Sequence, residues 1–253
     1  MEITVLCYHG VSETWPAETT VTPGALERQI AWYADRGYRP ATLTGALTDP
    51  PGERTLVVTF DDAHLSVLEE AAPILAERGV VATVYAPTGY VDSGDLMAWD
   101  GYNIWLGTPH EQELRPMSWQ QLGGLMERGW EVGSHTVSHP KLTEVDDDER
   151  LAEELDASRL RCVDELGVVD PTLAYPYGYH DARVRTAAGE AGYRVAVSMP
   201  QRPSPFLPMA WPRVGVYRHD SPRRLALRAW RYSQLGESGA ISRAIEWALS
   251  LRR

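Results

Sequence analysis

Residues 55–62 read TLVVTFDD, an apolar, β-branched run that stops on two adjacent carboxylates, Asp61 and Asp62. An apolar run of this length without polar alternation is typical of a strand buried on both faces of a parallel sheet. Two acids at the end of such a strand are costly unless their charge is used. The pair therefore predicts a metal ligand, a general base, or one of each.

Outward from this stretch, short apolar runs alternate with amphipathic segments and predict repeated βα units, which form parallel sheets. Strands are expected at Ile3–Tyr8, Thr55–Phe60, Val80–Tyr85, Trp130–Gly133, Thr172–Tyr175, Tyr193–Val197 and Val214–Tyr217. Helices are expected at Pro23–Arg36, Ser66–Arg78, Ser118–Arg128, Asp146–Leu166 and Asp181–Ala191. This number of strands favours a barrel, and a doubly wound open sheet is the alternative, because periodicity alone cannot close a barrel.

The bulk composition excludes several classes of function. A net charge of -11 and a pI near 5.1 argue against a nucleic-acid binder, which needs a basic face. No apolar run approaches the ~18 residues of a membrane helix. The two cysteines, Cys7 and Cys162, suggest neither a disulfide framework nor a zinc knot. Residues 1–6, MEITVL, lack the features of a signal peptide, so a cytoplasmic location is expected.

We find no repeat or linker that divides the chain, so a single domain over residues 1–253 is expected, with its core at about 3–217. The rest, residues 218–253, predicts one or two arginine-rich helices that are broken near Gly236 and Gly239. We expect these helices to pack on the outside of the body, with Trp230 and Trp247 on their apolar faces.

Polar residues follow the ends of several predicted strands. His9 comes after the first strand, Asp61 and Asp62 after the second, His135 after the fourth, and residues 175–178 (YPYG) after the fifth. Because the carboxyl ends of parallel strands lie on one face, these groups should converge there in either fold.

Residues 135–139 read HTVSH, a spacing that places His135 and His139 on one side of a helical turn. Neutral imidazoles are common ligands of zinc and its neighbours. Together with Asp62 they would supply three protein ligands and leave an open position for water, as a catalytic metal requires. The alternative is a set of solvated or core histidines beside a structural acid pair.

Taken in order, the motifs TFDD (residues 59–62), HTVSH (135–139) and YPYG (175–178) resemble those of the polysaccharide deacetylase family (NodB-homology, carbohydrate esterase family 4). The likeness runs from about Val5 to Val216. It implies a distorted (β/α)₇ barrel and the metal-dependent hydrolysis of an N-acetyl group, usually on N-acetylglucosamine units.

The resemblance also implies roles. Asp61 would be the general base, and Asp62, His135 and His139 would hold one divalent metal ion, zinc first, with cobalt or nickel as other choices. The backbone N–H of Tyr177 would contact the oxyanion, with Pro176 and Tyr175 at the same substrate site.

His9 is the candidate for the catalytic acid. Many family members carry an acidic histidine in a Leu-x-His motif near the C-terminus, and no such motif follows Val216 here. Tyr8-His9 instead resembles the N-terminal Tyr-His of the biofilm poly-N-acetylglucosamine deacetylases. The alternative is a hydrogen-bonded structural histidine at a strand end.

Two residues depart from the family pattern. The glycine that usually follows the two aspartates is Ala63, and the arginine that often orients the base is replaced by Ala174. Arg213, near the last strand, could reach back to Asp61 in its place, and a surface salt bridge is the alternative.

The segment Asp92–Pro116 fits no helix or strand and is longer than the family's usual connection. Its Trp99, Tyr102 and Trp105 could form a wall of the substrate cleft, since aromatic faces stack on sugar rings. A hydrophobic plug and an oligomer contact are the alternatives. Four further histidines are expected in loops or at the surface: His64, His110, His180 and His219.

The sequence thus predicts a metal-dependent deacetylase of a small N-acetylated saccharide or glycoside, with no nucleic-acid or membrane partner. The oligomeric state stays open. A hydrolase of another non-peptide amide and an inactive carbohydrate-binding relative are the alternatives.

Overall fold

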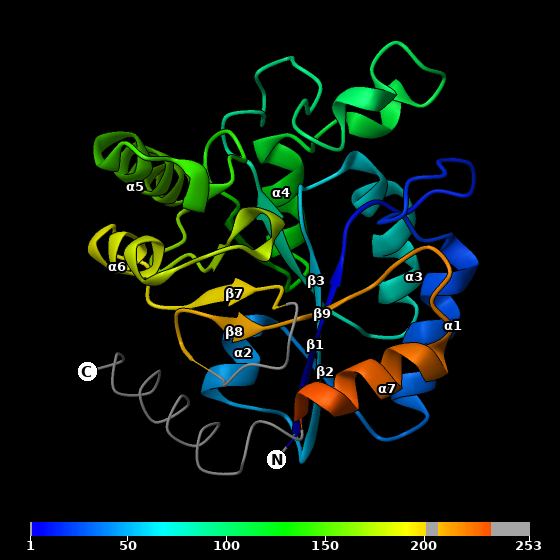
Figure 1. The fold of residues 1–253 in the computed structure, drawn as a ribbon. Helices are drawn as coiled ribbons and strands as arrows, with labels where there is room; N and C mark the ends of the chain where they lie inside the picture. Colours follow the sequence, from blue (N-terminus) through cyan, green and yellow to red (C-terminus); the bar gives the residue numbers. More distant parts are fainter. Residues whose placement is uncertain (1, 201–206, 234–253) are drawn as a thin grey trace.

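The computed structural model describes residues 2–200 and 207–233, whose strands form one sheet with every pair of neighbours parallel (Figure 1). The strands are β1 (Glu2–Tyr8), β2 (Arg39–Ala41), β3 (Arg54–Phe60), β4 (Thr83–Ala86), β5 (Glu131–Ser134), β6 (Leu173–Ala174), β7 (Ala196–Ser198), β8 (Trp211–Pro212) and β9 (Val214–Gly215).

The sheet nearly closes on itself. Its order is β8-β7-β6-β5-β4-β3-β1-β9, and the two end strands, β8 and β9, are separated in the chain by a single residue, Arg213. The short segment that contains both strands therefore pairs with β7 at one end and with β1 at the other. A doubly wound sheet would reverse its strand order, which this sheet does not do. With β8 and β9 counted as one interrupted strand, this path has seven strands, and the predicted distorted (β/α)₇ barrel is confirmed.

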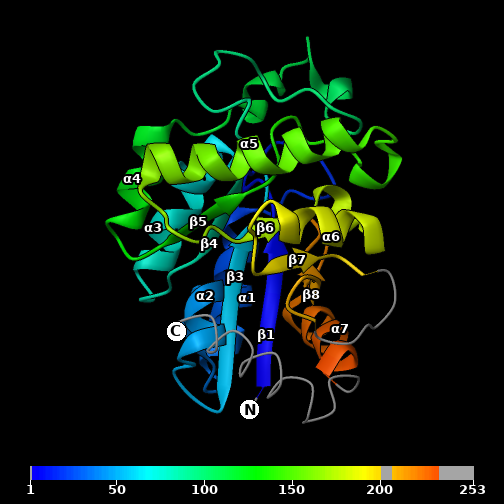
Figure 2. The same ribbon diagram turned by 90° about the vertical axis from the view of Figure 1, so that its left-hand side faces the viewer.

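Helices cover the outside of the barrel, and the long α5 runs across one side of it (Figure 2). They are α1 (Pro23–Ala34), α2 (Leu43–Thr48), α3 (Ala72–Ala76), α4 (Trp119–Met126), α5 (Asp148–Leu166), α6 (Ala182–Glu190) and α7 (Pro222–Ser233). Short 3₁₀ turns lie at Asn103–Trp105, Glu111–Leu114, Leu142–Glu144 and Pro176–Gly178. Within the described ranges, no helix is long and apolar enough to cross a membrane.

Several features differ from the sequence prediction, and β8 is among the elements that were not predicted. The single helix expected at Ser66–Arg78 begins with a π-helical turn, Val67–Ala71, before α3. Pro73 has no N–H to donate to the preceding turn, and such a gap in the hydrogen-bond ladder favours a wider turn. In addition, β2 and α2 were not predicted, because β2 has only three residues and contains Pro40, an edge-strand residue.

At the C-terminal side, α7 packs on the barrel through Leu225 and Ala229, which are buried in the main core. The prediction that Trp230 lies on an apolar packed face is wrong, because this side chain is 55% exposed. The predicted breaks at Gly236 and Gly239 and the placement of Trp247 lie outside the described residues.

Alternation along β3 divides its side chains between two cores. Leu56, Val58 and Phe60 point outward into the large cluster beneath the helices. Val57 points inward into a smaller cluster that fills the barrel. Since side chains alternate with a period of two, Thr59 and the residue after the strand, Asp61, continue the inward face. The buried strand thus delivers its first carboxylate to the barrel mouth.

Candidate active site

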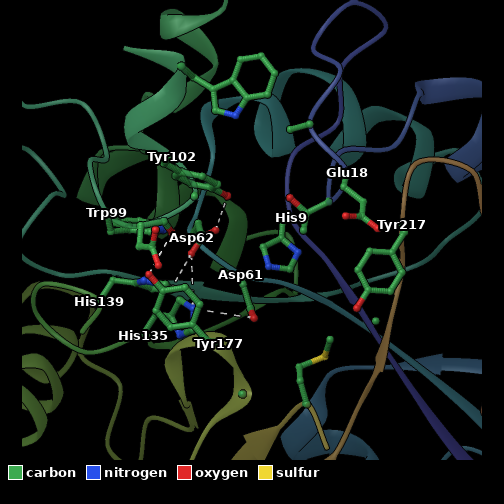
Figure 3. Close-up of a pocket in the computed structure, with 18 of the residues that line it drawn as sticks. His9, Glu18, Asp61, Asp62, Trp99, Tyr102, His135, His139, Tyr177 and Tyr217 are labelled. Atoms are coloured by element: carbon green, nitrogen blue, oxygen red, sulfur yellow. Dashed lines mark hydrogen bonds and ion pairs between the residues drawn. The ribbon is translucent and has the colours of Figure 1, made fainter. Parts of the chain in front are cut away.

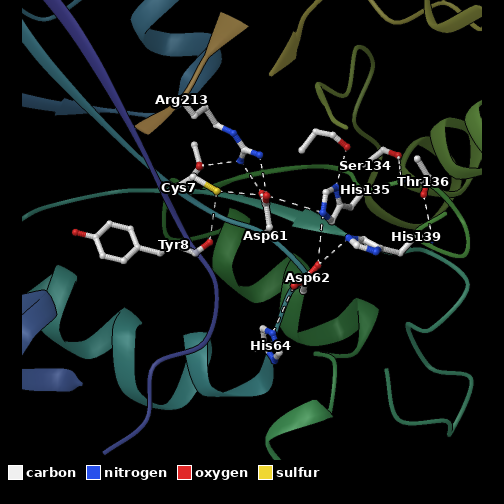
Figure 4. Close-up of polar contacts among 12 residues, drawn as sticks. Cys7, Tyr8, Asp61, Asp62, His64, Ser134, His135, Thr136, His139 and Arg213 are labelled. Atoms are coloured by element: carbon white, nitrogen blue, oxygen red, sulfur yellow. Dashed lines mark hydrogen bonds and ion pairs between the residues drawn. The ribbon is translucent and has the colours of Figure 1, made fainter. Parts of the chain in front are cut away.

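The same alternation brings an inward-facing set together near the carboxyl ends of the strands. Cys7 lies opposite Thr59 in the paired register of β1 and β3, and Arg213 lies in the gap between β8 and β9. Cys7 and Arg213 contact Asp61 directly (Figure 4). Arg213 also contacts Thr59.

Asp61 is held in a two-point ion pair by Arg213. Nη1 and Nη2 of the arginine donate to Oδ1 and Oδ2 of Asp61 at 2.6 and 2.7 Å. Nη1 also donates to Thr59 Oγ1 at 3.0 Å, and Arg213 is 1% exposed. The arginine therefore reaches back to Asp61 inside the barrel, and the alternative of a surface salt bridge is wrong.

The charge of Asp61 follows from these contacts. Burial raises the pKa of its carboxyl, but Arg213 and His135 outweigh that effect and bring the pKa to about 2. The Sγ–H of Cys7 is a further donor, 3.3 Å from Oδ2 of the same carboxylate. Asp61 is thus ionised at neutral pH and fixed in orientation.

Asp62 faces in another direction, toward two histidines. Its Oδ1 lies 3.5 Å from Nε2 of His135 and 3.5 Å from Nε2 of His139. One ligand atom from each of the three residues lies within 4.8 Å of the others, and all three residues are buried. Among the residues that the structure describes, Oδ1 of Asp62 has no hydrogen-bond donor. A buried carboxylate oxygen without a donor, facing two ring nitrogens, fits a divalent metal ion.

The tautomer of His135 suits this role. Its Nδ1 lies 2.8 Å from the carbonyl oxygen of Ala174, which can only accept a hydrogen bond. The Nδ1 atom therefore carries a proton, and in the neutral ring Nε2 presents its lone pair toward Asp62. Metal-binding histidines commonly use their second nitrogen in this way.

The protonation states agree with metal binding. Burial raises the pKa of Asp62, but the polar side chains that face it, His64 first and then His139, outweigh burial and hold the pKa well below its usual range. Burial lowers the pKa of His139 to about 3, helped by His135. A charged carboxylate and a neutral imidazole are the forms that ligate metals.

The backbone around these residues adopts left-handed conformations that side chains rarely take. Asp62 has φ of 68°, Ala63 of 50°, Thr136 of 65° and His139 of 60°. Each costs about 1–2 kcal/mol, and such strain concentrates at functional sites. The glycine usual in the family would meet no such cost at position 63, whereas Ala63 does.

Glu154, which the sequence reasoning did not identify, holds the loop that carries the two histidines. Its buried carboxylate on α5 accepts hydrogen bonds from the N–H groups of Val137 and Ser138, each at 2.9 Å. The Ser138 hydroxyl donates to the second oxygen. An acidic residue in the buried stripe of a predicted helix is the sequence signal that could have identified it.

The aromatic loop, Asp92–Pro116, closes over the candidate metal site. The Trp99 ring stacks on His139 with centroids 4.1 Å apart, and the Tyr102 hydroxyl donates to Oδ2 of Asp62 at 2.6 Å. The loop also packs on Trp15 in a separate apolar cluster. The loop therefore forms a wall of the cavity and is also a packed hydrophobic plug. These two predicted alternatives hold together.

Of the four histidines expected in loops or at the surface, His64 is fully buried. Its Nδ1 lies 2.8 Å from the carbonyl oxygen of Glu113, and its Nε2 lies 2.7 Å from the Tyr102 hydroxyl. His219 is exposed, as expected. His64 lies in the connection after β3, as expected, but its burial was not predicted, because nothing in its neighbouring residues indicates a partner thirty-eight positions away.

A cavity of about 500 Å³ opens above the cluster, a size typical of small-molecule sites. One wall is aromatic and the opposite wall is more polar (Figure 3). Figure 3 shows Trp99, Tyr102 and Tyr177 on one side and His9, Glu18 and Tyr217 on the other, with Asp61 and Asp62 between them. His135, His139 and Trp105 also line the cavity.

His9 lines this cavity, and its Nδ1 is buried without a hydrogen-bond partner in the described part of the chain. One of its ring nitrogens lies within 4.8 Å of an Asp61 carboxylate oxygen. Burial lowers the pKa of His9 against the opposing effect of Asp62 and Asp61.

Two residues expected at the substrate site lie elsewhere. Tyr175 is fully buried in a cluster beneath α5 and α6, and its hydroxyl donates to the carbonyl oxygen of Met209 at 2.9 Å. Pro176 is buried, and neither residue lines the cavity. Tyr177, which has φ of 57°, does line it.

The sequence profile of the family described as polysaccharide deacetylase matches residues 48–196, more than half of the chain. The chain therefore belongs to the polysaccharide deacetylase family. The family name describes hydrolases that remove acetyl groups from saccharides. The acetyl group is attached to the sugar through an amide or an ester.

Individual relatives are distant in sequence and close in fold. YxkH of Bacillus subtilis (strain 168), which is named for the same family, is 23% identical over 203 residues. That alignment covers 78% of this chain and 64% of the relative, so the chain spans less than two thirds of that protein's length.

Two solved structures show the shared fold over nearly the whole chain. The Streptococcus pyogenes deacetylase PplD, in complex with acetate, has a TM-score of 0.75 at 21% identity, over 90% of this chain and 98% of its own. IcaB from Ammonifex degensii has a TM-score of 0.72 at 23% identity, over 90% of this chain and 97% of its own.

Proposed function

We propose that this chain is a metal-dependent N-deacetylase, which hydrolyses the acetamide of an N-acetylated amino sugar to a free amine and acetate. The observation that carries this proposal is that the two neighbouring aspartates face different groups. Asp62 faces His135 and His139 through an oxygen that has no donor, whereas Asp61 is turned away and bound by Arg213.

Asp62, His135 and His139 would hold one divalent metal ion, with zinc as the first choice and cobalt or nickel as alternatives. Such an ion lowers the pKa of a water ligand toward neutrality and polarises a carbonyl group. Asp61 is ionised and fixed beside this site, so its role is to accept the proton of the attacking water.

The leaving amine must be protonated, and His9 is the group placed for that step. The low pKa of His9 makes its imidazolium a ready proton donor. It also means that the resting imidazole is neutral, so the proton must arrive during the reaction. Asp61, within 4.8 Å, is the residue that has just received one.

The substrate is a saccharide that fits a cavity of about 500 Å³ with one aromatic wall. Trp105 is half-buried and offers a surface on which a sugar ring can pack, whereas the Trp99 ring is stacked on His139 and Tyr102 and lines the cavity beside them. Tyr177 lies beside His139, with its backbone N–H proposed as a donor to the oxyanion. A small N-acetylglucosamine-containing saccharide or glycoside is the proposed class.

Metal analysis together with acetate release tests the proposal. We expect the zinc-loaded protein to release acetate from N-acetylated glycosides or chitooligosaccharides, and the metal-stripped protein to release none until zinc is restored. Turnover on O-acetylated sugars alone would contradict the choice of an amide. Tight sugar binding with bound metal but without turnover on any amide would instead indicate a carbohydrate-binding relative.

A further inference from the structure

A chain of buried polar contacts runs from the aromatic loop to Asp62. The Tyr102 hydroxyl donates to Oδ2 of Asp62 at 2.6 Å, and Nε2 of His64 lies 2.7 Å from the same hydroxyl. At the far end, Nδ1 of His64 donates to the Glu113 carbonyl oxygen at 2.8 Å. Asp62, His64 and Tyr102 are 2%, 0% and 7% exposed, so bulk water has little access to these contacts.

We propose that Tyr102 and His64 are positioning residues for the metal site and fix Asp62 as a ligand through one oxygen only. This inference rests on the proposed metal-dependent function. With Oδ2 bound to Tyr102, only Oδ1 of Asp62 remains free, and it is the atom that faces both histidines at 3.5 Å. A carboxylate free to rotate would offer both oxygens and occupy a second position around the ion.

The loop does not need the Tyr102 hydroxyl for its own attachment. Backbone hydrogen bonds at 2.8 Å already tie its end to the chain after β3, from Leu65 N–H to Arg115 and from Met117 N–H to Ala63. Trp15 and its apolar neighbours bury the rest of the loop. A hydroxyl buried in such surroundings is costly unless it has a partner, and here it donates to the proposed metal ligand, Asp62.

His64 in turn fixes the position of Tyr102. Its ring is held at one end by the Glu113 carbonyl, and it packs against the edge of Trp15 with ring centroids 5.5 Å apart. The other end lies 2.7 Å from the Tyr102 hydroxyl, so the fixed imidazole ring limits the directions in which the tyrosine can turn away from Asp62. Outer partners of this kind typically contribute 10–100-fold to metal affinity.

Tyr102→Phe tests the inference, with Tyr90→Phe as the matched control. The control also removes a tyrosine hydroxyl, from the residue two positions before the loop, where it donates to the carbonyl oxygen of Ala98 within the loop at 3.2 Å, away from Asp62. Zinc affinity of each metal-stripped protein is measured by competition with a chromophoric chelator. We expect the Kd of Tyr102→Phe to rise about 10–100-fold and that of Tyr90→Phe to stay at the wild-type value.

The double variant His64→Phe/Tyr102→Phe tests whether the two residues act through one bond. If they do, it binds zinc no more weakly than Tyr102→Phe alone, because the losses are not additive. Equal zinc affinities of Tyr102→Phe, Tyr90→Phe and wild type would overturn this inference and leave the proposed function standing. A wild-type protein without zinc affinity would overturn both.

Discussion

Asp61 and Asp62 are adjacent in the chain and have opposite surroundings. Asp61 continues the inward alternation of β3 and meets a guanidinium, whereas Asp62, at φ of 68°, turns toward two imidazoles. The change to a left-handed backbone at Asp62 breaks the alternation of the strand. One residue step therefore separates a proposed base from a proposed metal ligand.

Replacing each aspartate should separate these roles. We expect Asp62→Ala to lose zinc and activity together, because it removes the ligand oxygen. Asp61→Asn should keep zinc and lose activity by at least about 10²-fold, the contribution typical of a general base. Zinc content by mass spectrometry and acetate release are the measurements. Equal loss of zinc in both variants would show that the roles are assigned wrongly.

Arg213 should matter for both stability and turnover. Arg213→Ala leaves the Asp61 carboxylate buried without its ion-pair partner, a change that typically costs about 3–5 kcal/mol in the free energy of unfolding. Turnover should fall strongly while zinc remains bound, since no metal ligand is touched. Urea unfolding and zinc content are the measurements.

The double variant Arg213→Met/Asp61→Asn is the control for this interpretation. It removes both charges, so most of the lost unfolding free energy should return although activity does not. Unchanged turnover in Arg213→Ala would rule out a role for the arginine in orienting the base.

At the scale of elements, the β5–α5 connection is built around one carboxylate. Glu154 sits on the buried side of α5 and binds two backbone N–H groups between His135 and His139. The helix thereby fixes the loop that follows β5, and the left-handed residues Thr136 and His139 are held in place. A helix on the outside of the barrel thus shapes the loop at its mouth that carries two of the proposed metal ligands.

We therefore expect Glu154→Ala to lower the free energy of unfolding by about 1.5–3 kcal/mol, the range for hydrogen bonds to a charged group. It should also weaken zinc binding, because both histidine ligands lose their support. Glu153→Ala, at the exposed neighbouring position, is the control and should change stability by less than about 0.5 kcal/mol. Equal unfolding midpoints for the two variants would contradict this role of Glu154.

For the molecule as a whole, the balance of charge should influence which saccharides enter the cavity. The chain carries a net charge of -11, and the exposed Glu18 and Asp100 lie at the rim of the cavity. A field of one sign around a cleft changes the rate at which charged ligands arrive. Anionic saccharides should be disfavoured relative to neutral ones.

An N-acetylated amino sugar with a carboxylate, compared with its methyl ester, tests this expectation. The kcat/KM of the carboxylate should rise as ionic strength increases from 0.01 to 0.15 M, because the screening length falls from about 30 to 8 Å. The methyl ester should show no such rise. Parallel salt dependence of both compounds would exclude the effect.

The sequence by itself determined the parallel βα organisation and the residues that follow the strands. Both depend on local information: the apolar runs predict the strands, and their parallel order gathers His9, Asp61 and His135 at one end. Alternation along the strands could also have placed Cys7 beside Asp61, since they continue the same inward face.

Only the tertiary structure decided which partners these residues meet. Arg213 lies 152 positions from Asp61, and the gap between β8 and β9 exists only once the sheet has curved round to meet β1. Tyr102 reaches Asp62 through the packing of a loop that has no periodic pattern. Sequence periodicity reports the face on which a side chain lies, whereas its partner across the barrel depends on how distant segments pack.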